Sequence, residues 1–191
     1  MFHGGSMEMW KHYFGPEARI IGVDVDPQTR AFADEQVEIV IGDQGDRTFL
    51  RELRDRVGDV DIFIDDGGHK MHQQIATFEE MWPAVADDGV YLIEDLHTSY
   101  WPEYGGGGQD PTFIEFAKSL IDSINAWHAR ELHAEDAYTH SIKCMHVYES
   151  VIVFDKGVVA PPTDRITGHP QFELNEITQA IYAQSLDDSP G

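Results

Sequence analysis

Two pairs of acidic residues each follow a short apolar run, in a pattern that suits metal binding. Asp65-Asp66 follows Val60–Ile64, and Glu94-Asp95 follows Gly89–Ile93. If these runs are neighbouring parallel strands, their ends lie about 5 Å apart, and the carboxylates repel one another unless they are protonated or bridged by a cation. Carboxylates suit a hard cation such as Mg²⁺. The alternative is that each acid caps a helix or makes a turn, as the glycines after Asp66 would allow.

His69 lies three residues after Asp66, beyond two glycines that let the backbone approach a ligand closely. A histidine beside a metal-bound hydroxyl can act as a general base, because its usual pKa of about 6.5 lets it accept a proton at neutral pH. His69 and His72 could instead form a zinc-binding pair, with a carboxylate as the third ligand. His97, two residues after Asp95, is expected to contact the substrate or to support the metal ligands.

Three further features are consistent with a ligand that contains adenosine. Gly4-Gly5-Ser6 precedes a short amphipathic helix, and glycines at such a position let a cofactor approach the backbone. Asp24 ends the next apolar run, where an acid can bind ribose hydroxyls. Asp43-Gln44 ends the run after that and could hydrogen-bond an adenine edge. The glycine pair alone is a weak signal, and the three features together do not say which ligand is bound.

An aromatic stretch that becomes glycine-rich, LHTSYWPEYGGGG, covers residues 96–108 directly after the second acid pair. Tyr100, Trp101 and Tyr104 could stack on a sugar or on a polycyclic face, and Gly105–Gly108 would form a hinge or a flexible lid. The alternative is a disordered surface loop. Its position next to the acids favours a role in substrate binding.

Short β-branched runs alternate with helical patterns, which predicts an α/β fold with a mainly parallel sheet, helices on both faces and an antiparallel edge hairpin. In such sheets ligands bind beyond the carboxyl ends of the strands, where the acids described above lie. The expected strands are Ala18–Asp26, Val37–Ile41, Val60–Ile64, Gly89–Ile93, Ser141–Tyr148 and Val151–Asp155.

The helical patterns have recognisable ends. One helix is capped by Asp46 and ends before Gly58, and another covers about 71–86. A third begins at Asp110-Pro111 and carries an apolar stripe as far as Trp127.

Composition narrows the class of protein. Of 191 residues, 41% are hydrophobic, so a sizeable core can form in what the length predicts to be one domain. The formal charge of -22 disfavours nucleic acids and membrane surfaces as partners and favours cations. The single cysteine, Cys144, excludes a disulfide framework and a multi-cysteine zinc site. No membrane-spanning run or signal peptide is evident, so a cytoplasmic location is expected.

With these residues assembled, the sequence resembles class I S-adenosylmethionine-dependent methyltransferases. It looks most similar to the Mg²⁺-dependent sugar O-methyltransferases of macrolide and anthracycline-like antibiotic pathways, of the mycinamicin and elloramycin type. The resemblance runs from Phe2 to about Gly107 and returns at residues 146–157. Its motifs are FHGGSMEMW, IIGVDVDP, IGDQGD, FIDDGGHKMHQQ, LIEDLHTSYWPEYGG and HVYESVIVFDKG.

The resemblance implies a Rossmann-like methyltransferase domain over 1–160, followed by a C-terminal extension over 161–191. The last five residues, DDSPG, are expected to be disordered, as chain ends commonly are. The resemblance also implies a small-molecule glycoside as substrate, and a homo-oligomer is a possible assembly. Site roles carry over by position. Asp66, Glu94 and Asp95 match the Mg²⁺ ligands and His69 the general base; Gly4, Gly5, Ser6, Asp24, Asp43, Gln44 and Asp65 match the methyl-donor site; His97, Tyr100, Trp101 and Tyr104 are the expected substrate contacts.

One feature departs from the family pattern. In the family, a strand of the type EIGV runs directly into the glycine loop, whereas this sequence starts with Phe2-His3 already inside that loop. The expectation is therefore a chain that lacks the family's first strand, through a truncated gene or a misassigned start codon. Two other functions stay open: an iron-dependent hydroxylase of the cephalosporin hydroxylase type, with His69, Asp66 and His97 as ligands, and a non-catalytic remnant.

Overall fold

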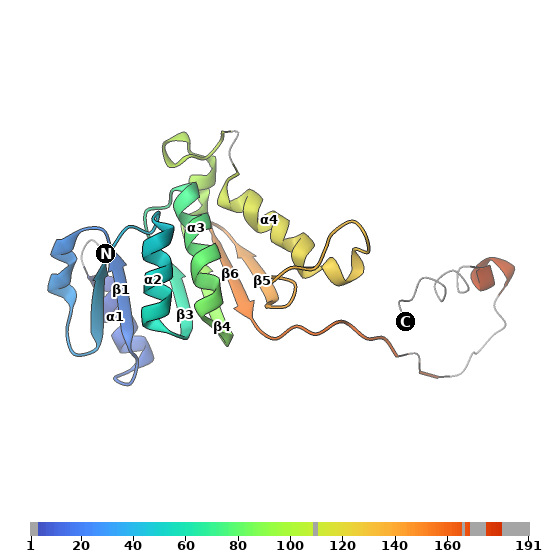
Figure 1. Cartoon of the computed structure of the whole chain (residues 1–191), viewed down its shortest axis with the longest axis horizontal. Coiled ribbons are helices and arrows are strands. Elements are labelled where there is room, and N and C mark those ends of the chain that lie inside the picture. Colours follow the sequence, from blue (N-terminus) through green and yellow to red (C-terminus); the bar gives the residue numbers. More distant parts are fainter. Residues whose placement is uncertain (1–3, 109–110, 166, 169–174, 181–191) are drawn as a thin grey trace. The chain divides into compact units, whose positions relative to one another are not determined.

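The computed structural model describes residues 4–108, 111–165, 167–168 and 175–180 (Figure 1). The chain divides into two units, Met1–Pro161 and Pro162–Gly191. The second unit includes a short helix over 176–180, which begins where the Asn175 side chain accepts hydrogen bonds from the Thr178 N–H and hydroxyl. Asp110 and residues 187–191, for which the sequence predicts a helix start and disorder, lie outside the described residues.

The first two strands of the chain form a parallel pair. β1 (Ile20–Asp24) and β2 (Val37–Ile41) pair along their whole length, and the 3₁₀ helix η1 (Pro27–Phe32) connects them. Both strands were predicted. β1 ends before Asp26 because the Asp26 N–H donates to the Asp24 carboxylate at 2.9 Å, which turns the backbone out of the strand direction.

The other four strands form a mixed sheet in the order β3-β4-β6-β5. Only the β3–β4 pair is parallel; β6 pairs antiparallel with both β4 and β5. The predicted antiparallel hairpin is therefore confirmed, and its second strand is the one that lies next to β4. The strands are β3 (Val60–Asp65), β4 (Val85–Ile93), β5 (Ile142–Tyr148) and β6 (Val151–Lys156).

One face of this sheet carries the core. Tyr91 and Phe154 lie opposite each other on β4 and β6, and both are fully buried. The Phe78 ring lies 4.9 Å from the Tyr91 ring and 4.8 Å from the Phe154 ring. Burying aromatic rings of this size contributes about 1.5–3 kcal/mol each. The helices that supply residues to this core are α2 (Arg47–Val57), α3 (Met71–Met81) and α4 (Phe113–Ile124), of which α2 and α3 lie in front of β3 and β4 in Figure 1.

Helix α2 begins and ends where the sequence predicts, whereas α3 is shorter than predicted. Asp46 caps α2 by accepting from the Thr48 N–H at 2.8 Å, and Gly58 follows its last residue. α3 ends at Met81, before Pro83, which has no N–H to continue the helical hydrogen bonds. The chain continues as the 3₁₀ helix η2 (Trp82–Ala84). The carbonyls of Trp82, Pro83 and Val85 accept hydrogen bonds from the Lys156 ammonium group on β6. This long-range contact could not be inferred from helical periodicity.

Two other boundaries differ from the prediction. β4 begins at Val85 rather than Gly89, because Val85 is buried and pairs with Val60 of β3. The pairing register shifts between Val60 and Ile62. α4 begins at Phe113, where the Thr112 hydroxyl accepts from the Glu115 N–H at 3.2 Å. The cap is therefore Thr112 rather than Asp110, and Trp127 falls in a separate 3₁₀ helix, η5 (Ala126–His128).

The strands form two sheets where the sequence predicts one mainly parallel sheet. β1 and β3 are each an outermost strand of their sheet, so among the described residues each is paired on one side only. Ile62 of β3 is 43% exposed. Among the described residues, no strand joins the two sheets.

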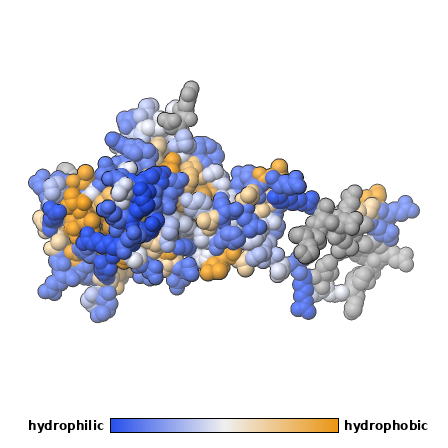
Figure 2. Space-filling model, in the orientation of Figure 1, coloured by the Kyte–Doolittle hydropathy of each residue, from blue (hydrophilic) through white to orange (hydrophobic). Residues whose placement is uncertain are grey.

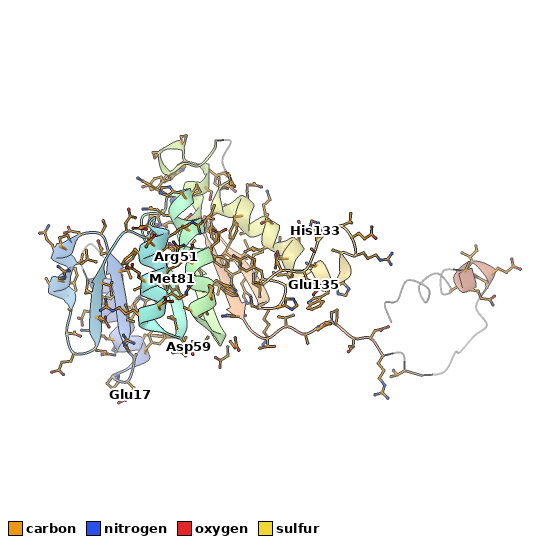
Figure 3. All side chains as sticks on the ribbon, viewed as in Figure 1. Glu17, Arg51, Asp59, Met81, His133 and Glu135 are labelled. Carbon is orange, nitrogen blue, oxygen red and sulfur yellow. The ribbon has the colours of Figure 1, made fainter. Side chains whose placement is uncertain are left out.

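Charged side chains link α2 to α3 on the outside of the molecule. Arg51 on α2, labelled in Figure 3, forms an ion pair with Glu80 at 3.0 Å, and Arg47 binds both Glu79 and Glu80. These pairs contribute to the strongly hydrophilic surface over α2 in Figure 2. Because they are partly exposed, each stabilises the fold by no more than about 1 kcal/mol. No helix among the described residues is long and apolar enough to cross a membrane.

The N-terminal helix is tied to the β2 strand through Asp34. Lys11 of α1 (Gly5–Phe14) donates to the Asp34 carboxylate at 2.8 Å, and the same carboxylate accepts from the Gln36 and Val37 N–H groups. These contacts, with that from Lys11 the strongest, lower the pKa of Asp34 from 3.8 to about 2. The ionised carboxylate therefore stabilises the folded chain above pH 3.8, and this contribution is lost as the pH falls towards 2.

We expect Asp34→Asn to lower the melting temperature at neutral pH, and the difference from the unchanged chain to shrink as the pH falls from 3.8 to about 2. Thermal unfolding followed by circular dichroism over this pH range measures it. Asp59→Asn, at an exposed acid just before β3, is the matched control and should melt like the unchanged chain. A difference for Asp34→Asn that persisted undiminished at pH 2 would contradict the assignment.

Candidate metal and methyl-donor site

The two acid pairs lie at adjacent strand ends, as the sequence predicts. Asp65 of β3 is in register with Ile93 of β4, and the Glu94 N–H donates to the Asp65 carbonyl at 3.0 Å. The backbone ladder thus extends to the point where Asp66 and Asp95 leave the sheet. Neighbouring parallel strands therefore bring both pairs to one edge of the sheet.

Three side chains converge at this edge. Potential ligand atoms of Asp66, His69 and Asp95 all lie within 4.8 Å of one another. His69 Nε2 lies 3.4 Å from Asp95 Oδ2 and 3.9 Å from Asp66 Oδ1. The two carboxylates are about half exposed, whereas the His69 side chain is only 18% exposed. This arrangement gives an accessible oxygen-rich site with an imidazole on its protein side.

Glu94 belongs to the same edge but not to this closest group. Burial raises the pKa of its carboxyl, and the negative charges of Asp66 and Asp95 raise it further. Burial is the larger cause of this shift, and a cation between the carboxylates would relieve the part that comes from their repulsion. Glu94 is thus electrostatically coupled to the other two acids, and a bound cation would favour its ionised form.

The backbone at the site adopts unusual conformations. His69 and Asp95 both have positive φ values, 52° and 55°, which non-glycine residues seldom adopt. The hydroxyl of the buried Thr98 lies within hydrogen-bonding distance of both carbonyls, 2.7 Å from Asp95 O and 3.2 Å from His69 O. One side chain therefore holds the two strained residues together. Thr98 belongs to the 3₁₀ helix η3 (Leu96–Tyr100). Sequence reasoning missed it, because nothing near it in the sequence indicates that its hydroxyl lies beside these two carbonyls.

Asp65 plays a different part from its neighbour Asp66. It is buried, and burial raises the pKa of its carboxyl to about 6, although a hydrogen bond from Gln44 Nε2 at 2.9 Å opposes the shift. Gln44 Oε1 accepts from the Gly68 N–H at 2.6 Å. A Cβ atom at Gly67 would lie 1.9 Å from Gln44 Oε1, so a larger residue there would displace the Gln44 side chain. Both ends of the Gln44 amide are thus engaged in holding the loop after β3.

Several buried polar atoms at this edge have no hydrogen-bond partner in the part of the chain that is described. They are Asp65 Oδ2, His69 Nδ1, Gln73 Oε1 and Gln74 Oε1. The Asp65 carboxyl also interacts with the buried Tyr91 hydroxyl. Leaving an atom such as the other three unsatisfied costs about 1–3 kcal/mol, so a bound group that supplied partners would stabilise this edge.

His97 is held by a residue that is distant from it in the sequence. The ring Nδ1 of His97 lies 2.7 Å from the hydroxyl oxygen of Ser150, in the turn between β5 and β6. The backbone N–H of His97 donates to the same oxygen. The Leu96 N–H donates to the Ser150 carbonyl at 3.0 Å. Ser150 has a φ of 61°, a third unusual backbone position near the site. The sequence gives no local signal for this contact, which joins residues 53 positions apart.

The aromatic stretch lies beside His97 and is not a free lid. The His97 and Trp101 rings meet edge to face at 4.6 Å, and Tyr104 follows at 5.9 Å from Trp101, while Tyr100 is 69% exposed. The Gly106 N–H donates to the Trp101 carbonyl at 2.9 Å, and a Cβ there would lie 2.4 Å from a backbone oxygen. The prediction of a flexible glycine hinge is therefore not supported at Gly105–Gly107, which are hydrogen-bonded to residues 99–102.

The predicted methyl-donor residues lie at the starts and ends of local elements. Gly4 precedes α1 and accepts from the Met7 N–H, and Gly5 and Ser6 form its first turn. Asp24 is the last residue of β1, and its carbonyl accepts from the Gly42 N–H. Asp43 follows β2 and accepts from the Gly45 N–H at 2.7 Å. These positions fit the predicted role but do not test it.

The two alternative metal sites are not assembled. The ligand groups among the described residues contain His69 with Asp66 and Asp95, but neither His72 nor His97. His72 is exposed on the first turn of α3, and His97 Nδ1 is engaged by Ser150. The zinc pair and the iron site with two histidines therefore have no geometric support.

Comparison with known proteins identifies the same segments. A family model described as a methyltransferase domain matches residues 2–96. The chain is 39% identical over 160 residues to a tetracenomycin-C 3'-O-methyltransferase that acts on the 2-methoxy-rhamnosyl compound, from Streptomyces olivaceus, and 38% identical over 162 residues to demethylmacrocin O-methyltransferase from Streptomyces fradiae. Both matches cover 81% of this chain and 40% of the relative.

A solved structure gives the same result. The MycE methyltransferase of the mycinamycin biosynthetic pathway, in complex with Mg and SAH, is 31% identical, with a TM-score of 0.76. The match covers 95% of this chain and 46% of that one. The chain thus spans less than half the length of these relatives. With the fold, the motifs and the relatives in agreement, residues 2–96 match the methyltransferase-domain family, and the chain has a Rossmann-like methyltransferase fold.

Proposed function

We propose that this chain forms the donor-binding and metal-binding part of an S-adenosylmethionine-dependent O-methyltransferase. Its acceptor would be a sugar hydroxyl of a glycosylated natural product, and its metal Mg²⁺. The observation that carries the proposal is the convergence of Asp66, His69 and Asp95 at the ends of two neighbouring parallel strands. The names of the relatives support the substrate class, since they describe methylation of rhamnosyl and macrolide compounds.

The residues present fit Mg²⁺. Asp66 and Asp95 offer accessible carboxylate oxygens, and Glu94 is close enough for its carboxyl pKa to respond to both charges. Oxygen ligands without a thiolate are those that Mg²⁺ prefers. When bound there, Mg²⁺ supplies a positive charge that lowers the pKa of a sugar hydroxyl.

The chain's own residues then place the reactants and take up the proton. Asp66, Glu94 and Asp95 hold the cation, and Thr98 fixes the backbone from which His69 and Asp95 project. His69 Nε2 faces the carboxylates and is the atom that would accept the hydroxyl proton. The acceptor oxygen forms a bond to the donor methyl as the carbon–sulfur bond breaks, and the proton goes to His69.

The methyl donor would bind across the edge formed by the ends of β1, β2 and β3. Gly4-Gly5-Ser6 would face its polar end, Asp24 its ribose hydroxyls and Asp43 its adenine edge. Gln44 and Asp65 would act indirectly, because the Gln44 amide is already bonded to Asp65 and Gly68. The donor carries its methyl group on a cationic sulfonium, which suits a chain of net charge -22.

The acceptor would bind to the aromatic residues beside the metal site. His97 and Trp101 pack edge to face, Tyr104 lies beside Trp101, and Tyr100 is exposed to solvent. Aromatic faces of this kind stack on sugars. The oligomeric state and a cytoplasmic location remain predictions from the sequence.

Calorimetric titration of S-adenosylhomocysteine into the chain, with folding checked by circular dichroism, tests the proposal. Micromolar binding by a folded chain supports it, and transfer of a labelled methyl group to a macrolide glycoside in the presence of Mg²⁺ would complete the test. A folded chain that binds no S-adenosylhomocysteine overturns it and favours a non-catalytic remnant. Dependence on Fe(II) and oxygen would instead indicate a hydroxylase.

Ser150→Gly is expected to raise the KM for the acceptor several-fold while the Mg²⁺ dependence stays unchanged. Glycine adopts the φ of 61° without strain, so the turn is kept and only the hydroxyl that holds His97 is lost. Steady-state kinetics with varied acceptor measure the effect. Glu149→Ala in the same turn is the control, and an unchanged KM for Ser150→Gly would argue against a role of His97 in acceptor binding.

A further inference from the structure

A second group of potential metal ligands lies on the hairpin formed by β5 and β6. Ligand atoms of Cys144, His146 and Asp155 all lie within 4.8 Å of one another. His146 Nε2 lies 2.9 Å from Asp155 Oδ2. The three residues are partly buried, so a ligand could reach them from solvent.

Strand geometry explains why these side chains meet. Cys144 and His146 are two positions apart on β5 and so project from the same face of the sheet. Asp155 of β6 lies directly opposite Cys144 in the register. Phe154, the neighbour of Asp155, points into the core, so the three ligands lie on the opposite face. A rigid antiparallel pair thus fixes the positions from which all three project.

This group is distinct from the methyltransferase site. The turn that reaches that site contains Ser150, and Asp155 lies five residues further along β6. At about 3.3 Å per residue, the two positions are on the order of 16 Å apart. No residue is shared between this group and Asp66, His69 and Asp95.

The chemistry of the three side chains selects a particular kind of ion. Thiolate, imidazole and carboxylate are the ligands of Zn²⁺, whereas Mg²⁺ avoids sulfur. With zinc–ligand bonds of about 2.0–2.3 Å, tetrahedral ligands lie about 3.4–3.8 Å apart. Side chains already within 4.8 Å need only small rotations to reach this spacing. We propose that Cys144, His146 and Asp155 form a Zn²⁺ site in which the ion replaces the hydrogen bond between His146 and Asp155.

Such a site would join the two strands of the hairpin through their side chains. Three protein ligands leave a fourth position open to water. Because an ion that binds only the folded chain stabilises it, the melting temperature should rise with Zn²⁺ concentration.

Titration with Co²⁺ as a spectroscopic substitute for Zn²⁺ tests the proposal in the complete 191-residue chain. Excess Mg²⁺ is kept present throughout, so that the carboxylate site is occupied. Because Cys144 is the only cysteine, a near-ultraviolet thiolate-to-cobalt charge-transfer band identifies its coordination without ambiguity. The expected result is a band that saturates at one equivalent of Co²⁺ and disappears when Zn²⁺ is added.

The other two ligands are tested by substitution. His146→Gln and Asp155→Asn should each weaken Co²⁺ binding more than about tenfold. Substituting residues that only support the ligands commonly lowers metal affinity by that much, and losing a ligand itself should lower it further. His140→Gln, at an exposed histidine outside the group, and Asp66→Asn, in the other site, should leave the band and the affinity unchanged. Circular dichroism confirms that each variant is folded.

Two outcomes would overturn the proposal. The first is the absence of a thiolate band in the folded unchanged chain. The second is a band whose affinity is the same in His146→Gln and Asp155→Asn, since this would show a thiol that binds cobalt without the other two residues. Both are independent of S-adenosylhomocysteine binding, so the zinc site and the proposed methyltransferase activity fail or succeed separately.

Discussion

Asp66→Ala is expected to reduce Mg²⁺-dependent methyl transfer more than about 100-fold, because a metal ion contributes several kcal/mol to such a reaction. Asp66 supplies one of the two accessible carboxylates in the ligand group, and it leaves the sheet directly after β3. Its side chain is half exposed, so the alanine variant should fold without difficulty. Initial rates measured over a range of Mg²⁺ concentrations would show the loss, together with a higher requirement for the metal.

Asp61→Ala is the matched control for this experiment. Asp61 is an exposed acid of the same strand, and it does not belong to the ligand group. Its removal changes the net charge by the same amount and should leave the rate and the metal requirement unaltered. If Asp66→Ala and the unchanged chain showed equal dependence on Mg²⁺, Asp66 would not be a ligand.

His69→Asn should lower the rate of methyl transfer about 10²–10⁴-fold while Mg²⁺ binding is retained. Asparagine tolerates positive φ, so it suits the backbone at this position, where φ is 52°. The variant removes the imidazole that faces Asp95 and Asp66 but leaves both carboxylates in place. Single-turnover rates, with metal affinity measured in parallel, separate the two effects.

The parallel measurement matters because His69 lies close enough to the acids to be a ligand itself. Loss of a general base lowers the rate alone, whereas loss of a metal ligand also weakens metal binding. His72→Gln changes a neighbouring exposed histidine and should leave both quantities unchanged. A strong fall in metal affinity for His69→Asn would reassign His69 from proton acceptor to ligand.

Local patterns predicted most of the elements because each depends on nearby residues. Strand β2 and helix α2 match their predicted bounds, since the apolar run forms β2 itself and the Asp46 and Gly58 caps lie directly beside the ends of α2. The adjacency of β3 and β4, on which the metal site depends, follows from the general preference of consecutive strands with one crossover helix to pair.

What could not be predicted depends on contacts between distant residues. Lys156 binds the carbonyls that follow α3, and the sequence around α3 does not contain that contact. Ser150 reaches His97 across 53 positions. The hydrogen bonds of Gln44 with Asp65 and Gly68 were likewise not predicted, because the two loops meet only in the folded chain.

The edge position of β3 has a consequence for amide exchange with solvent. In a parallel pair, alternate residues of a strand direct their N–H groups towards the partner, and the residues between them direct theirs to the other side. Val90–Ile93 of β4 is paired on both sides, so its amides should be protected, whereas among the described residues β3 is paired with β4 alone. Exchange rates along Val60–Asp65 should therefore alternate between slow and fast, in a strand that runs directly into the metal site.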